Sequence, residues 1–257
     1  MKKLRYYLVL LLLPCVLSVL AQTREEIAGR FLINKAEELG LTPGDLAGLQ
    51  LSGNYLSKKS GVENFYYQQM RKGIEVRGAI FNVHITQDNK VLTCGSRFVP
   101  HLAGRIKSEK ITLTPAVAVE VAAAHLGYTL TQPLELLTEN GGPERETIFA
   151  GGSLSAEDIT VKLVYQPLPG GAVKLAWDLA IYEPSLQNWW SVRIDVATGQ
   201  LLDKNNLVIH CHWGDAPPET SAPNMPSIPP AAAPLPALVA NYNVFAVPME
   251  SPNHGSR

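Results

Sequence analysis

The sequence lacks a surplus of either charge: 22 Lys and Arg stand against 23 Asp and Glu, a formal net charge of −1 over 257 residues. A duplex-binding surface needs clustered cations that displace counterions from phosphates, and here the two signs are interspersed. The composition therefore argues against nucleic acid as a partner. The apolar fraction of 46% lies in the ordinary globular range and suffices for one or two buried cores.

The sequence also lacks the helical His-Glu-x-x-His pattern, in which two imidazoles one turn apart grip zinc and a Glu acts as general base. The six histidines are His84, His101, His125, His210, His212 and His254, and none has a partner four residues away. Local signatures of Ser-His-Asp or Cys-His catalysis are missing as well. We therefore predict no catalytic, cofactor-binding or metal-binding residues within this chain.

One compact cluster, His210-Cys211-His212, contains residue types that bind metals. On a strand the two histidines would share a face and could hold a metal with a third ligand from elsewhere. The simpler interpretation is the solvent-exposed end of a strand.

The first residues resemble an export signal. Residues 1–5 are basic, residues 6–20 are apolar apart from Pro14, Cys15 and Ser18, and residues 19–21 offer small side chains for cleavage. A retained membrane anchor is the alternative, but the run is shorter than the roughly 20 residues that a spanning helix needs. We predict a signal peptide over 1–21, a secreted, periplasmic or extracellular location, and membrane contact only during export.

The sequence is poor in cysteine, with three in all. Loss of the signal peptide would remove Cys15 and leave Cys94 and Cys211 in an oxidising compartment, where one disulfide between them is allowed. Two buried thiols that act as small hydrophobes are the alternative.

Residues 22–105 predict a first α+β module. Residues 24–39 have helical apolar spacing, with Thr23 as N-cap, Glu26 in the capping-box position and Gly40 as the stop. The period then changes to two, with turn residues between four stretches. We expect strands over 51–58, 64–70, 75–86 and 91–99, a meander whose one face the helix covers.

Residues 106–213 repeat this plan after a connector over 100–110. Thr114 and Pro115 predict the start of a helix, which continues to Leu126 and ends at Gly127. Alternation predicts strands over 159–166, 173–182, 189–196 and 200–203. The expected fold class is α+β, in the form of two small modules that each pack a helix on an antiparallel sheet.

Several polar and aromatic residues lie on these later strands. Asp178, Asp195 and Asp203 are interpreted as turn caps or solvated strand edges, since their spacing forces no two of them together. Alternation places Trp189 and Trp190 on opposite faces. We identify Trp190 and Arg193 as candidate residues for contact with a partner domain, because interfaces favour both residue types.

The composition changes after Trp213. Residues 214–238 are rich in Pro and Ala, which is typical of an extended linker, and strand-like residues resume over 242–250. Because a linker followed by a lone strand has no structural purpose by itself, we interpret residues 239–257 as the start of a truncated further domain.

The segment from Tyr66 to Ala79, continued by residues 81–85 and 95–98, resembles the fungalysin/thermolysin propeptide motif. That motif joins an aromatic-x-Gln-Gln strand to an Asn-Gly-Ile-Pro-Val-type turn; here Lys72 replaces the Asn and Glu75 replaces the Pro. Residues 177–179 and 190–199 resemble the PepSY module of peptidase propeptides. Residues 242–257 resemble the first strand and loop of a fungalysin-type catalytic domain.

This resemblance implies a propeptide that assists the folding of a secreted zinc metallopeptidase and blocks its cleft. Its partner would be the catalytic domain of the same polypeptide, and the zinc would lie in that domain, which is absent from this chain. The alternative is a stand-alone exported PepSY-type protein that binds or modulates a peptidase. Neither interpretation makes this chain an enzyme by itself.

Overall fold

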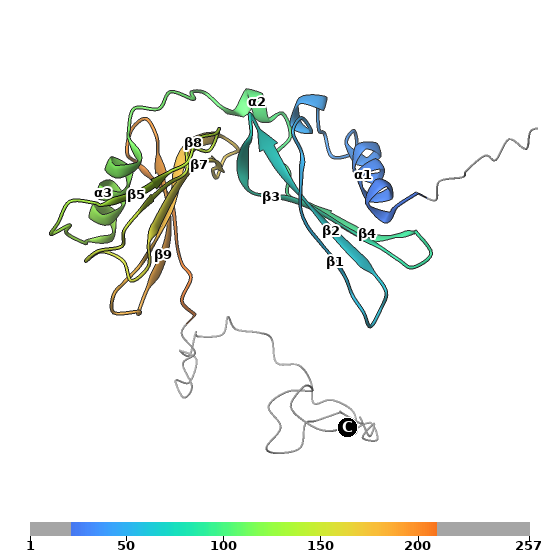
Figure 1. Ribbon diagram of the computed structural model, residues 1–257. Helices are drawn as coiled ribbons and strands as arrows, with labels where there is room; N and C mark the ends of the chain where they lie inside the picture. Colours follow the sequence, from blue (N-terminus) through green and yellow to red (C-terminus); the bar gives the residue numbers. More distant parts are fainter. Residues whose placement is uncertain (1–21, 210–257) are drawn as a thin grey trace, which may run out of the picture. The chain divides into compact units, whose positions relative to one another are not determined.

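The computed structural model describes residues 22–209 (Figure 1). The predicted signal peptide, linker and final strand lie outside these residues, as does the His210-Cys211-His212 cluster. In chain order the elements are α1 (Arg24–Lys35), η1 (Pro43–Asp45), β1 (Gln50–Leu56), β2 (Glu63–Arg71), β3 (Ile74–Ile85), β4 (Val91–Ser96), α2 (Leu102–Arg105), α3 (Pro115–Leu126), β5 (Leu136–Glu139), β6 (Thr147–Phe149), β7 (Ile159–Pro167), β8 (Val173–Tyr182), β9 (Trp189–Asp195) and β10 (Leu201–Asn206).

The first module is a four-stranded antiparallel meander, β1–β2–β3–β4, with α1 on one face. Along β2 the side chains of Phe65 and Tyr67 are buried toward α1, which contributes Ala28 and Leu32 to the same core. Alternate burial along β3 matches the predicted period of two. The expected helix-on-sheet arrangement is confirmed.

Helix α1 begins as predicted and ends earlier. The Thr23 hydroxyl accepts from the Glu26 N–H, and the Glu26 carboxylate accepts from the Thr23 N–H, which completes the capping box. The helix ends at Lys35 rather than Leu39, because the next N–H groups change partners: Gly40 donates to Glu37 and Leu41 donates to Ala36. Gly40 adopts a φ of +67° in this closing turn.

The connector over 100–110 contains a short helix, α2, that the sequence did not indicate. Its first N–H groups, those of His101 and Leu102, donate to the Asp45 carboxylate at 2.8 Å each, and the Thr42 N–H donates to it at 2.8 Å. Burial alone would raise the pKa of Asp45, but these bonds outweigh it and hold that pKa below its usual value. Asp45, 2% exposed, thereby fixes α2 against the first module.

The second module pairs β5–β6–β7–β8–β9–β10 in antiparallel order, with α3 packed on β7, β8 and β9. Thr114 caps α3, Pro115 occupies its first position and Gly127 ends it with a φ of +83°, as the sequence predicts. Strand β5 was not predicted, because all four of its residues are exposed and carry no alternation. No helix within residues 22–209 combines the length and the apolar character needed to cross a bilayer.

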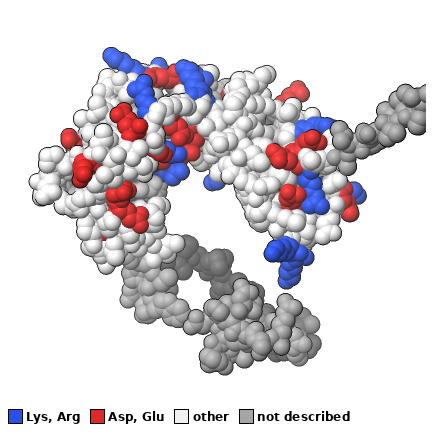
Figure 2. Space-filling view, viewed as in Figure 1, with Lys and Arg blue, Asp and Glu red and all other residues white. Residues whose placement is uncertain are grey.

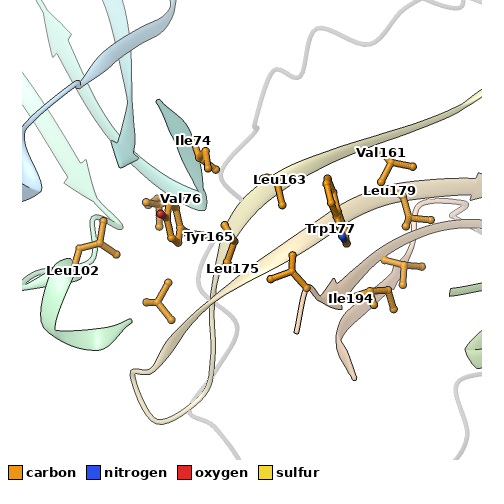
Figure 3. Close-up of a cluster of buried hydrophobic side chains, with 14 of the residues drawn as sticks. Ile74, Val76, Leu102, Val161, Leu163, Tyr165, Leu175, Trp177, Leu179 and Ile194 are labelled. Atoms are coloured by element: carbon orange, nitrogen blue, oxygen red, sulfur yellow. The ribbon is translucent and has the colours of Figure 1, made fainter. Parts of the chain in front are cut away.

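The two modules share one ten-stranded sheet. Its main path runs β1-β2-β3-β7-β8-β9-β10, and the link is a parallel pairing of β3 with β7 at Val76 and Tyr165. The hydrophobic core continues across this link, where Val76, Tyr165 and Leu175 lie near one another (Figure 3). The predicted α+β class is confirmed, and the structure adds the strand pairing that joins the two sheets.

Candidate partner-binding region

The β2–β3 hairpin is supported by two glutamines at a β-bulge, where the register shifts between Gln68 and Met70. The Gln68 side-chain amide donates to the carbonyl oxygens of Val76 at 2.7 Å and Ala79 at 3.1 Å. The fully buried Gln69 side chain exchanges two bonds with the backbone of Val99, at 2.8 and 3.0 Å. Gln68 thus bonds carbonyl groups at the irregular part of β3, and Gln69 joins β2 to the segment after β4.

The turn of this hairpin lies against the second module. Lys72 and Gly73 both adopt positive φ, +51° and +77°. A Cβ on Gly73 would lie 2.6 Å from the Cγ atom of Pro143, so a larger residue would clash there. Glycine is therefore required at this turn by conformation and by the close approach of the neighbouring loop.

Glu109 joins the turn to the second module. Its carboxylate pairs with Arg71 at 3.1 Å and with Lys72, and it accepts from the Tyr165 hydroxyl at 2.8 Å. The Lys72 contact above all, with Tyr165 and Arg71, outweighs burial and lowers the pKa of Glu109 to about 2. Burial and the Glu109 carboxylate raise the pKa of Tyr165 to about 12. The β3–β7 link is thus reinforced by a charged hydrogen-bond cluster.

A row of alternating charges crosses the face of the sheet opposite α3. We call it the charge ladder, and it consists of Glu75, Lys162, Asp178, Arg193 and Asp203, which lie on β3, β7, β8, β9 and β10. Lys162 lies 3.4 Å from Glu75, and Arg193 lies 2.9 Å from Asp178 and 3.2 Å from Asp203. Because the ladder extends from β3 to β10, it connects the two modules electrostatically.

The ladder corrects the interpretation of Asp178 as a turn cap or a solvated strand edge, because its side chain is only 14% exposed and pairs with Arg193. Asp178 and Asp203 are register partners of Arg193 on either side of β9. Burial raises the pKa of Asp178, and the Arg193 cation opposes that rise. Asp195 does cap a turn, since it accepts from the N–H groups of Ala197 and Thr198.

The two candidate contact residues occupy different environments. Arg193 is 2% exposed and directs its guanidinium into the ladder. Trp190 is half-buried; its ring nitrogen donates to the Tyr128 hydroxyl at 2.9 Å, and the Lys204 ammonium lies 4.9 Å from its ring centroid. Both side chains therefore have partners within the chain, and contact with another domain stays a prediction.

Cys94 is exposed on β4, and its predicted disulfide partner, Cys211, lies outside the described residues. The disulfide stays a prediction. Within residues 22–209 no group of three or more His, Cys, Asp or Glu side chains is arranged to hold a metal ion.

Sequence reasoning missed Asp45, Glu109 and Tyr165. Each makes at least one of its contacts across 56 or more residues, and such a contact leaves no local pattern in the sequence. Arg193 could have been paired with its aspartates from the strand alternation, once the registers of β8, β9 and β10 were known.

Comparison with known proteins identifies a motif within the first module. Residues 51–98, which span β1 to the segment after β4, match the family described as Fungalysin/Thermolysin Propeptide Motif. The chain therefore carries a propeptide motif of the fungalysin and thermolysin type, as the sequence predicted.

Particular relatives are extracellular metalloproteinases of fungi. The chain is 29% identical to extracellular metalloproteinase mep of Aspergillus niger over 161 residues, which is 62% of this chain and 24% of that protein. It is 29% identical to mep of Aspergillus fumigatus over 146 residues, 55% and 22% of the two chains. The matches thus cover about a quarter of the relatives' own length.

Two solved structures share weak similarity. The Bacillus megaterium YpeB C-terminal domain aligns at 11% identity and a TM-score of 0.30, covering 72% of this chain and 64% of its own. A putative lipoprotein from Clostridium difficile 630 aligns at 10% identity and a TM-score of 0.22, covering 70% and 91%.

Proposed function

We propose that residues 22–209 are the propeptide of a secreted fungalysin-like zinc metallopeptidase, which inhibits the catalytic domain of the same polypeptide and assists its folding. The observation that carries this proposal is the propeptide motif over 51–98, extended by similarity to extracellular metalloproteinases over as many as 161 residues. In this proposal the signal peptide over 1–21 directs export, and the zinc belongs to the catalytic domain.

The fold supplies what such a role requires. An inhibitor that acts by contact needs a large surface that is formed before its partner arrives, because ordering on binding costs free energy. The shared sheet, the Glu109 cluster and the charge ladder hold the two modules together as such a surface. This surface would exclude substrate without any chemistry of its own.

The test begins with the reading frame beyond Arg257, which should encode a His-Glu-x-x-His helix. The catalytic domain that it encodes is then produced alone and refolded with and without the purified chain. We expect the chain at micromolar concentration to raise the yield of folded domain and to inhibit its cleavage of casein. A stop codon directly after Arg257 in the native transcript, or no effect on either measurement, would overturn the proposal.

A further inference from the structure

One face of the β1–β4 meander carries no helix within the described residues, because α1 packs on the other. We call it the tyrosine face, and it consists of Tyr55, Asn64, Tyr66, His84, Leu92 and Thr93. The strand registers place Tyr55, Asn64, His84 and Thr93 side by side in one row across four strands. Most of these residues line a shallow depression of about 420 Å³.

The tyrosine face exposes aromatic and aliphatic surface. Tyr55 is 56% exposed and Leu92 is 60% exposed. The Tyr55 and Tyr66 rings are stacked, with centroids 6.2 Å apart and planes 15° from parallel. Tyrosine combines a broad apolar ring with a polar hydroxyl and is enriched in protein interfaces, so this face has the composition of a contact surface.

The polar groups of the face are held in place in advance. Asn64 is 7% exposed, and its side-chain amide donates to the Tyr55 carbonyl oxygen at 3.2 Å. One ring nitrogen of His84 contacts the Asn64 side-chain oxygen, and the other lies 3.0 Å from the Asn82 side-chain nitrogen. Side chains that are already ordered lose little entropy when a partner binds.

The face carries no Lys, Arg, Asp or Glu. Figure 2 shows the surface over β1 and β2 mostly white, with charged atoms gathered near α1 and at the tip of the β1–β2 hairpin. Depletion of charge at the centre is characteristic of protein–protein contact surfaces. The complementary surface should therefore be uncharged, apolar and able to form hydrogen bonds.

We propose that the tyrosine face is the docking surface for the catalytic domain, an inference that rests on the proposed function. The face lies within the propeptide motif over 51–98. The similarity to the Aspergillus niger metalloproteinase covers only 24% of that protein, so most of the relative's chain lies outside the match. In the proposal, the counterpart of that larger part is the catalytic domain that binds the tyrosine face.

The test uses the purified chain, the separately produced catalytic domain and two matched double variants. Tyr55→Ala/Leu92→Ser alters the face at two side chains that are more than half exposed, so it should leave the fold intact. Ile33→Ser/Leu136→Ser alters equally exposed side chains, 65% and 54%, on α1 and β5. Circular dichroism and the thermal midpoint verify that each variant is folded.

We expect Tyr55→Ala/Leu92→Ser to weaken inhibition of the catalytic domain roughly 10- to 100-fold, as loss of hot-spot residues does, and the control to change it less than about threefold. If the wild-type chain inhibits and the face variant inhibits equally well, the docking assignment is wrong and the proposed function stands. If the wild-type chain neither binds nor inhibits, the proposed function fails and the assignment with it. A wild-type dimer in size-exclusion chromatography that the face variant abolishes would identify a second copy as the occupant and overturn the assignment.

Discussion

Replacement of Asp45 by alanine should destabilise the protein strongly, although Asp45 is remote from any predicted contact residue. Its carboxylate accepts from three backbone N–H groups and from the Thr42 hydroxyl, all at 2.8 Å, and the residue is 2% exposed. A buried donor left without a partner costs about 1–3 kcal/mol. Water can reach some of these donors, but the Leu102 N–H is buried.

We therefore expect Asp45→Ala to lower the free energy of unfolding by about 3–5 kcal/mol, because three backbone donors lose their acceptor at about 1–3 kcal/mol each and the part-buried ones regain some hydration. For a chain of this size about 1 kcal/mol shifts Tm by roughly 2–4 °C, so Tm should fall by roughly 6–20 °C. Asp45→Asn keeps one acceptor oxygen and should lose about half as much. The control is Asp88→Ala in the exposed β3–β4 turn, which should change stability by less than about 0.5 kcal/mol.

Urea and thermal unfolding, followed by the fluorescence of the buried Trp177, measure these effects. The pKa of Asp45 lies below its usual value in the folded protein. Its contribution is therefore complete above the unfolded pKa and is lost as pH falls through the folded one. A loss below about 1 kcal/mol for Asp45→Ala at pH 7 would refute the reasoning, because it would show that α2 needs no support from this carboxylate.

Two further predictions concern the charge ladder and the Glu109 cluster. Arg193→Met leaves the largely buried Asp178 carboxylate without its cation and should lower the free energy of unfolding in urea by about 3–5 kcal/mol. Asp203→Asn, at the exposed end of the ladder, should lower it by about 1 kcal/mol or less. Equal effects of the two variants would contradict the argument from burial. Glu109, with its pKa lowered from 4.5 to about 2, should stabilise the fold fully above pH 4.5 and progressively less as pH falls toward 2. In the Glu109→Gln variant, Tm should therefore fall less steeply as the pH is lowered from 4.5 toward 2. An equally steep fall of Tm in the variant would contradict the stabilising role of Glu109.

The sequence allowed prediction of those elements whose signals are local. The capping box at Thr23 and Glu26, the start of α3 at Thr114 and Pro115, and the antiparallel strands all depend on neighbours in sequence or on a period of two. The propeptide motif lay within this predictable part. The α+β class followed because each run of strands had a predicted helix before it.

Features that depend on distant partners were not predictable. Helix α2 has four residues and is stabilised by Asp45, more than fifty positions earlier, so no periodicity could reveal it. Strand β5 has neither a buried residue nor alternation. The ion pairs of the charge ladder could be predicted only with the registers of β8, β9 and β10 known. Alternation tells which face of the sheet a residue lies on, but not which residue of the next strand lies beside it.

The parallel pairing between Val76 and Tyr165 has a consequence for the order of folding. The antiparallel pairings within the first module join residues at most 22 positions apart, whereas this pairing closes a loop of 89 residues. Closing a long loop costs more chain entropy, and local contacts form faster. The β1–β4 meander can therefore be complete while the rest of the polypeptide is still emerging from the ribosome. The pairing of β3 with β7 then forms last.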